Sequence, residues 1–203
     1  IDGHPYKYNN TLPFSNSWVR DAGVYGNFHT MRFQQLASSG SYFKLGPFMG
    51  TAKNYDILRY DDILLILAEA YIQLGQQDLA LPLINQVRQR AANSTAKLAK
   101  ADGTFASKYN VKTYSNTGWT KDFALKALQW ERRMEFATEG SRFFDLVRWG
   151  IAEPVLNDYI NKEKVRRTFL GTAKFTAGRD EYLPIPQAEI TFTNGLYKQN
   201  PGY

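Results

Sequence analysis

The sequence predicts a mainly α-helical protein with one helical hairpin, further helices, long irregular loops and little β-structure. Dense helical periodicity covers residues 55–92 and 119–150, and glycines stand near the ends of these runs. Residues 1–54 have neither helical nor strand periodicity and predict long aromatic loops, with room for a short hairpin. Because 203 residues suffice for one sizeable core, we expect a single domain over residues 1–203.

The hairpin is predicted over residues 55–92. From Tyr55 onward the first helix is apolar almost all round, which predicts burial on most sides, and Gly75 is expected to end it. Asp78 is expected to cap the second helix. Small residues at the helix contact and a glycine in the turn resemble a tetratricopeptide unit. Such a unit needs a neighbour, which is either further repeats upstream of Ile1 or the rest of this chain.

A helix pair is predicted over residues 119–150. Thr120 is expected to cap its first helix and Gly140 to end it, and a short second helix should stop at Gly150. An apolar stripe at steps of three and four residues should face the core. It consists of Phe123, Ala127, Trp130, Met134 and Ala137.

Two further segments are predicted to be irregular. Residues 93–118 are polar and contain scattered Gly, Ser, Thr and Asn, which is typical of a loop insertion. In residues 151–203 the alternating prolines of YLPIPQ force an extended path, so we expect an irregular C-terminal segment.

The composition argues against several classes of function. The chain has no cysteine, and neither of its two histidines has a partner at metal-ligand spacing, so no metal or cofactor is expected. No GxxxxGK loop or GxSxG motif supports nucleotide hydrolysis or serine esterase chemistry. The formal charge of +6 is spread along the chain and does not predict nucleic-acid binding. No apolar run is long enough to span a bilayer.

Three glutamates at steps of four residues invite a catalytic hypothesis. Glu131, Glu135 and Glu139 would lie on one side of a helix, as a glycosidase or metal site requires. Arg132 and Arg142 stand three residues from members of this series and can neutralise them through ion pairs. We therefore favour a structural role for these carboxylates.

The aromatic content favours sugar binding. Aromatic residues make up 15% of the chain, and in the loops they alternate with amides and charged groups. A ring stacks on the apolar face of a pyranose, and polar side chains bind its hydroxyls. The alternative is that these rings pin loops onto the helices. The candidate ligand-binding residues are Trp18, Arg20, Asp21, Tyr25, Asn27, Tyr114 and Trp119.

An ordered series of motifs resembles the C-terminal domain of the SusD/RagB family. The series is LRYDDILLILAEAYIQLG, INQVRQRA, ERRMEFATEGSRFFDLVRWG, YLPIPQAEI and QNPGY, between residues 58 and 203. The string WVRDAGVYGNFHTMRF near the start is similar to a family segment, less specifically.

This resemblance implies a nutrient-binding lipoprotein on the outer-membrane surface, with its helical repeat scaffold mostly in an N-terminal half, so that only part of the scaffold is expected in this chain. It also implies a SusC-like TonB-dependent transporter as partner, which receives oligosaccharide or sometimes peptide from the binding protein. The lipid-bearing cysteine of the family has no counterpart in this sequence, so the anchor is expected outside it.

We thus expect non-catalytic binding of glycans and their delivery to the transporter. One alternative is a helical-repeat module that binds proteins or peptides and would expose a groove on the hairpin of residues 55–92. A less favoured alternative is a glycoside hydrolase that uses Glu131 or Glu135.

Overall fold

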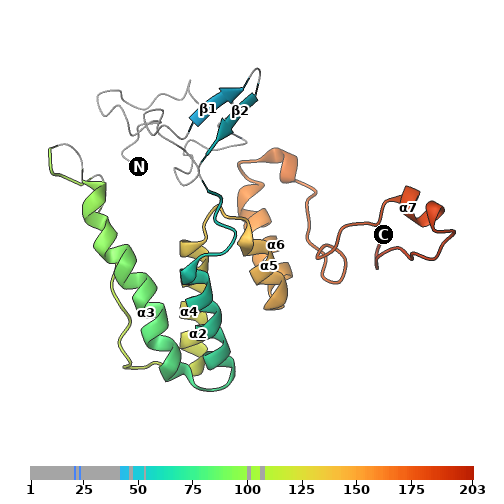
Figure 1. The fold of residues 1–203 in the computed structure, drawn as a ribbon. Helices are drawn as coiled ribbons and strands as arrows, with labels where there is room; N and C mark the ends of the chain where they lie inside the picture. The colour runs from blue at the N-terminus through green and yellow to red at the C-terminus, as the bar shows by residue number, and fades with distance from the viewer. Residues whose placement is uncertain are drawn as a thin grey trace. The chain divides into compact units, whose positions relative to one another are not determined.

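The computed structural model is mainly helical, as the sequence predicts (Figure 1). The chain divides into two compact units, residues 1–138 (the first unit) and residues 139–203 (the second unit). Each unit is described by itself. The structure describes residues 42–45, 48–52, 54–99, 102–105 and 108–203, together with Asp21 and Gly23.

A short antiparallel hairpin joins β1 (Tyr42–Leu45) and β2 (Phe48–Thr51). Phe43 lies opposite Gly50 in this pair. A Cβ atom at Gly50 would lie 2.5 Å from the Phe43 ring, so the ring can cross the partner strand only because this residue is glycine.

The predicted helical hairpin is confirmed as α2 (Tyr60–Gln73) and α3 (Gln77–Ser94). Gly75 makes the turn with a φ of 74°, a conformation that favours glycine. The cap expected at Asp78 was wrong, because α3 begins at Gln77 and Gln76 holds the cap position. Asp78 instead lies in the first turn of α3, where its negative charge interacts favourably with the positive end of the helix dipole.

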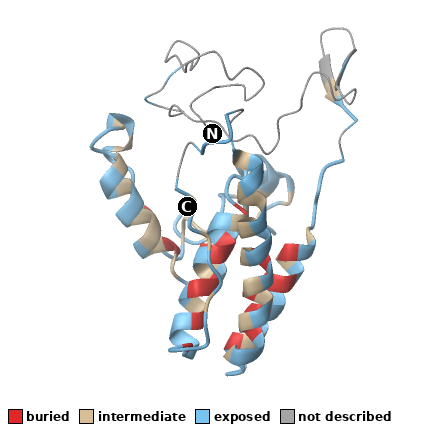
Figure 2. Cartoon of the chain, turned by 90° about the vertical axis from the view of Figure 1, so that its left-hand side faces the viewer, coloured by how far each residue is buried: buried red, intermediate tan, exposed pale blue. Residues whose placement is uncertain are grey.

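The core of the first unit lies where α2, α3 and α4 (Lys121–Glu135) meet. Figure 2 shows the buried positions as short patches along the helices. Burying an aliphatic side chain of this size stabilises a fold by about 1.5–3 kcal/mol. The side chains with no exposed surface include Leu65, Ile72, Ile84 and Leu128.

The predicted core stripe of α4 was wrong. Phe123, Trp130 and Met134 are 45%, 55% and 54% exposed. The buried face is rotated from that stripe, because two alanines allow close helix contact and two charged residues find ionic partners there. This face comprises Ala124, Ala127, Leu128, Glu131 and Arg132. The predicted cap is confirmed, since the backbone N–H of Phe123 donates to Thr120 Oγ1 over 3.3 Å.

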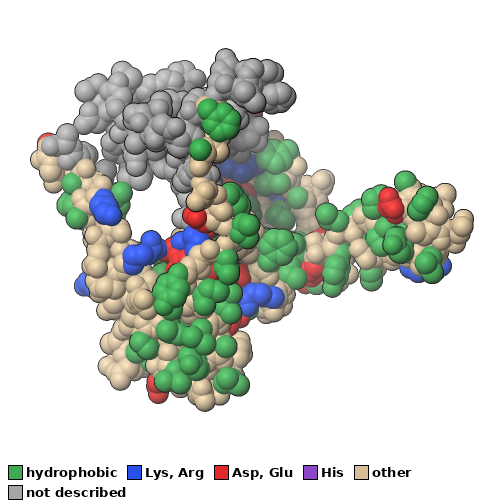
Figure 3. Space-filling model, in the orientation of Figure 1, with side chains coloured by type: hydrophobic (Ala, Val, Ile, Leu, Met, Phe, Trp, Pro, Cys, Tyr) green, Lys and Arg blue, Asp and Glu red, His purple; other side chains and the backbone are tan. Residues whose placement is uncertain are grey.

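Burial of α2 on most sides was also predicted and is not observed. Ile63, Ile66 and Leu67 remain 45%, 49% and 41% exposed, although the opposite face of the helix is buried. Hydrophobic side chains gather in the space-filling view over the region of α2 and α4 (Figure 3). The first unit therefore carries an apolar surface that its own core does not use.

The segment predicted as a loop insertion, residues 93–118, begins at the end of α3. α3 extends to Ser94, a 3-10 turn η3 (Thr95–Leu98) follows, and Ala99 pairs with Phe105 in an isolated bridge. No helix within the described residues is long and apolar enough to cross a membrane.

The second unit contains α5 (Ser141–Arg148), α6 (Ala152–Glu163), the 3-10 turn η4 (Thr168–Leu170) and α7 (Gln187–Phe192). The irregular path predicted from residue 151 was wrong for Ala152–Glu163, where Pro154 is tolerated because it lies in the first turn of a helix. The core of this unit is small and consists of Leu146, Ala152 and Phe175.

Of the two glycines around α5, Gly140 has a different role from the one predicted. α4 ends at Glu135, before Gly140, and Gly140 with a φ of 86° instead precedes the first residue of α5. Gly150 follows α5 with a φ of 68°, as predicted.

An amide side chain clamps a loop residue in both units. Asn85 Nδ2 donates to the carbonyl of Tyr114 over 2.8 Å, and the N–H of Tyr114 donates back to Asn85 Oδ1 over 2.7 Å. Asn157 holds Phe175 through the same pair of bonds, of 2.9 and 2.8 Å. Each bond pair satisfies both backbone groups of a loop residue that has no strand partner.

Candidate functional site

Two of the predicted ligand-binding residues, Tyr114 and Trp119, lie together. Their ring centroids are 5.5 Å apart, and Phe123 packs edge-on against both. Trp119 is only 5% exposed, and its Nε1 donates to the carbonyl of Gln77 over 2.8 Å. These contacts fit the alternative considered for the rings, in which they pin a loop onto the helices.

Of the other predicted site residues, the structure describes Asp21. Asp21 accepts a hydrogen bond of 3.0 Å from the backbone N–H of Gly23. The remaining predictions lie outside the described residues. They are Trp18, Arg20, Tyr25 and Asn27.

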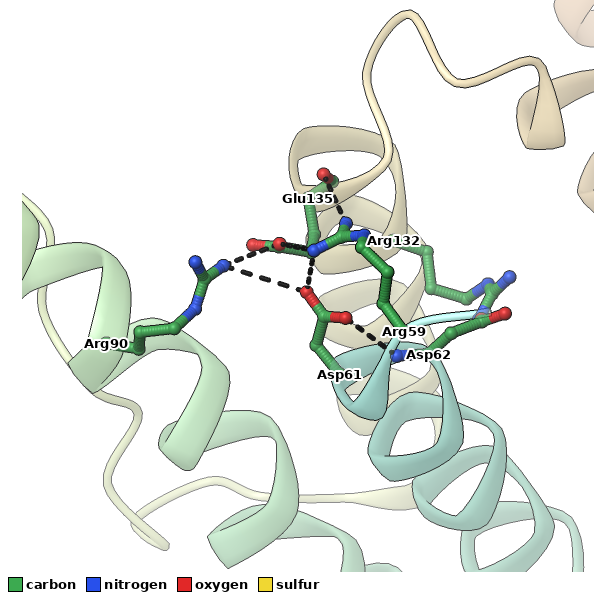
Figure 4. Close-up of polar contacts among 6 residues, drawn as sticks. All are labelled: Arg59, Asp61, Asp62, Arg90, Arg132 and Glu135. Carbon is green, nitrogen blue, oxygen red and sulfur yellow. Dashed lines mark hydrogen bonds and ion pairs between the residues drawn. The ribbon is translucent and has the colours of Figure 1, made fainter. Parts of the chain in front are cut away.

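The carboxylates of the first unit form an ion-pair network across three helices (Figure 4). Arg59 Nη1 donates to both Asp61 and Glu135, and the bond to Glu135 Oε1 is 2.9 Å long. Arg90 from α3 reaches the same carboxylates, with Nη2 2.5 Å from Glu135 Oε1 and 3.7 Å from Asp61 Oδ2. Two arginines thus neutralise two carboxylates at the junction of α2, α3 and α4.

Two further pairs extend this pattern. Arg132 Nη1 donates to Asp62 Oδ1 over 2.7 Å, and Arg88 Nη1 donates to Glu131 Oε2 over 2.7 Å. Ion pairing within and between helices was predicted for the glutamate series. The sequence had suggested Arg132 for Glu135, whereas the strong contacts of Glu135 come from α3 and from the residue before α2.

Burial and the neighbouring arginines act in opposite directions on the pKa values of these carboxylates. It raises the pKa of Glu131 above its ordinary value, and the hydrogen bond and charge of Arg88 oppose this rise. Burial and a hydrogen bond with Asp61 raise the pKa of Glu135, against the effect of Arg59. Burial also acts to raise the pKa of Asp61, but the hydrogen bond with Glu135 and the two arginine charges outweigh it and lower that pKa. Asp61 therefore loses its proton at a lower pH than Glu135 does.

This geometry favours a structural network over a hydrolytic site. Glu131 is 4% exposed, and the Glu135 side chain is 9% exposed, so neither carboxylate faces an open cleft. Within the described part of the chain, no group of His, Asp and Glu side chains could hold a metal ion.

An open pocket of about 600 Å³, lined by the side chains of polar and basic residues, lies on the outer face of α3 and η3. Arg90 belongs both to this pocket and to the ion-pair network, so the network fixes one wall of the pocket. No sequence motif pointed to this face, whose only signal is a run of polar residues at helical spacing. The described residues that line it are Gln86, Gln89, Arg90, Asn93, Ser94 and Lys97.

Two curated proteins of Formosa agariphila are similar to this chain. SusD-like protein P38 is 36% identical over 103 residues, which cover 51% of this chain and 18% of P38. SusD-like protein P2 is 27% identical over 155 residues, which cover 75% of this chain and 26% of P2. The chain thus aligns with less than a third of the length of these relatives.

The model of the SusD family matches residues 2–203, almost the whole chain. Proteins of this family are generally nutrient- and glycan-binding lipoproteins of the outer-membrane surface, associated with SusC-like transporters and without catalytic activity of their own. The C-terminal motif series, the mainly helical fold and the two similar proteins agree with this match. The chain belongs to the SusD family.

Proposed function

We propose that this chain is part of a protein that binds oligosaccharides at the outer-membrane surface and passes them to a SusC-like TonB-dependent transporter. The match of the family model to residues 2–203 carries this proposal. The paired and buried carboxylates of the first unit support binding without bond cleavage, because a glycosidase needs an acid and a base that reach its substrate. The lipid anchor would lie in a part of the protein outside this chain.

Capture would use rings for stacking and polar side chains for hydroxyl groups. The loop residues predicted for this role remain Trp18, Arg20, Asp21, Tyr25 and Asn27. Hand-over to the transporter would follow from a hinge motion of the binding protein on its partner.

The binding proposal is tested with a glycan array and calorimetry on the full-length protein and its Trp18→Ala variant. Loss of a stacking ring should weaken binding by about tenfold. Trp130→Ala is the matched control, because Trp130 is 55% exposed on α4 and is not a predicted ligand residue. Equal affinity of Trp18→Ala and the parent protein would remove Trp18 from the site, and absence of any glycan binding would overturn the proposal.

Catalysis is tested separately. We expect no new reducing ends when the protein is incubated with the polysaccharides it binds. Turnover that disappears in Glu131→Gln or Glu135→Gln would contradict a binding-only function. Co-purification with a SusC-like transporter, expressed together with the full-length protein, tests the partner.

Peptide binding by the helical hairpin is a second candidate, favoured by the exposed apolar face of α2. This face presents Ile63, Ile66 and Leu67, which could bind the apolar side of a partner helix. A peptide array would show sequence-selective binding lost in Ile66→Asp. Glycan binding in the same protein, unchanged by Ile66→Asp, would favour the first proposal.

A further inference from the structure

We propose that the open pocket on α3 binds the acidic group of an anionic oligosaccharide, a carboxylate or a sulfate, through the amide and basic groups that line it. This inference rests on the proposed function and adds a site and a ligand class to it. The pocket volume of about 600 Å³ accommodates one or two sugar rings, since ligand sites commonly measure about 300–1,000 Å³.

The lining residues occupy one face of a helix. They recur from residue 86 to residue 97 at steps of three and one, so their side chains project from the same side of α3 and η3. The opposite face of α3 is held in the core by Ala80, Ile84 and Val87. The pocket wall is therefore carried by a helix whose position the core fixes.

The lining chemistry favours an acceptor-rich ligand. Among the described lining residues there are three primary amides, one hydroxyl, one guanidinium and one ammonium, and no carboxylate. Gln89 Nε2 donates to Asn93 Oδ1 over 2.8 Å, which leaves the Asn93 Nδ2 group to donate elsewhere. Because the Ser94 hydroxyl donates to the carbonyl of Arg90 over 2.8 Å, the amides, the guanidinium and the ammonium are the donors for the oxygens of an acidic sugar.

The two cations provide the charge. Arg90 uses its Nη2 group for Glu135, and its side chain is still 57% exposed. This contact orients the guanidinium, so that less side-chain entropy is lost when a ligand binds. Among the described residues, the Lys97 ammonium makes no ion pair or hydrogen bond, so its charge is available to an anion.

Other anions are less suited to this pocket. Single-stranded nucleic acid is bound by aromatic side chains on which its bases stack, and no ring is among the described lining residues. Amides and a hydroxyl beside the cations are suited to the hydroxyl-rich rings of a sugar.

The test is calorimetry on the full-length protein with a galacturonate oligosaccharide, a sulfated galactan oligosaccharide and a neutral xylo-oligosaccharide of equal length. The first two probes distinguish a carboxylate from a sulfate. We expect tighter binding of one acidic probe than of the neutral one, and weaker binding of it as NaCl rises from about 50 to 300 mM.

Lys97→Gln should weaken binding of that acidic probe by about tenfold and leave the neutral probe unchanged. Lys126→Gln is the matched control, because it removes the same charge from an exposed position of α4 outside the pocket. Asn93→Ala should also weaken binding, through loss of an amide donor, and circular dichroism verifies that each variant is folded.

The outcomes separate this proposal from the proposed function. If the chain binds the neutral probe as tightly as both acidic probes, and Lys97→Gln matches the parent, the pocket assignment fails while glycan binding stands. An equal loss in Lys126→Gln would reveal attraction by net charge and would also overturn the pocket. If the full-length protein binds none of the three probes nor any glycan on an array, both proposals fail.

Discussion

The same amide clamp holds a loop residue in each unit, but different forces support it. In the first unit, Arg88 Nε donates to the carbonyl of Lys112 over 2.5 Å, and its guanidinium lies 4.4 Å from the centre of the Tyr114 ring. In the second unit, the Phe175 ring is 7% exposed and packs 6.3 Å from the ring of Phe143. Polar ties support the first clamp, and a buried ring supports the second.

This difference follows from the size of the two cores. Three helices enclose the core of the first unit, which leaves enough buried surface to hold charged side chains in pairs. The second unit has three buried apolar residues, so one aromatic ring supplies a large part of its core. The same pair of hydrogen bonds can therefore occur in loops that are stabilised by different neighbouring contacts.

The largest expected effect comes from Arg88→Met. It removes the partner of the buried Glu131 carboxylate, the bond to Lys112 and the contact with Tyr114, and should lower the free energy of unfolding by about 3–5 kcal/mol near neutral pH. Urea unfolding measures this loss. Lys162→Met is the control, since the pair of Lys162 and Asp158 is exposed and should contribute less than about 1 kcal/mol.

The cost of Arg88→Met should also depend on pH. Burial raises the pKa of Glu131, so its contribution to stability is present below the ordinary glutamate pKa and is lost as pH rises through the higher value in the folded state. Without Arg88 this pKa rises further. The loss of free energy of unfolding in Arg88→Met should therefore become smaller as the pH falls from neutral toward about 4.5. An equal loss at neutral pH and at about pH 4.5 would contradict this account.

Phe175→Ala should destabilise the second unit by about 3 kcal/mol, because it leaves a cavity in a small core. Phe192→Ala is the control, since that ring is 85% exposed and its loss should change stability by less than about 0.5 kcal/mol. Amide hydrogen exchange in residues 139–203, recorded at increasing urea concentrations, measures the stability of the second unit in both variants. Equal stability of the two would show that the ring does not support the second clamp.

The clamps themselves should have a smaller effect, of about 1–3 kcal/mol for each asparagine-to-alanine change. In Asn85→Ala, Arg88 and Trp119 still tie the loop to the helices. Amide hydrogen exchange should therefore increase more around Phe175 in Asn157→Ala than around Tyr114 in Asn85→Ala. The opposite order would mean that the buried ring restrains its loop better than the polar ties do.

The smallest effect concerns how α4 and α5 begin. Thr120→Ala removes the side-chain cap of α4 and should cost about 1 kcal/mol, whereas Thr120→Ser keeps the oxygen and should cost much less. α5 has no side-chain cap, because Gly140 stands at that position. Thermal unfolding of the two Thr120 variants measures the difference, and equal melting temperatures would show that the cap contributes nothing.

The sequence by itself determined the mainly helical class, the hairpin and several helix ends. Gly75, Gly150 and Thr120 were predicted correctly because a left-handed turn or a cap depends on one residue and its immediate neighbours. α6 was missed, since the alternating prolines further along the chain dominated the pattern there, and Pro154 in a first turn does not prevent a helix. The motif series also identified the family, which residues 2–203 match.

Only the tertiary structure decided which faces are buried and which charges meet. Periodicity predicted an apolar stripe on α4, but the helix buries a different face because its neighbours supply arginine and carboxylate partners there. Arg88 and Glu131 are 43 residues apart, and Arg59 and Glu135 are 76 apart, so no local pattern reveals their pairing. The pocket on α3 has the same origin, since a polar face becomes a site only when packing fixes the helix and orients Arg90.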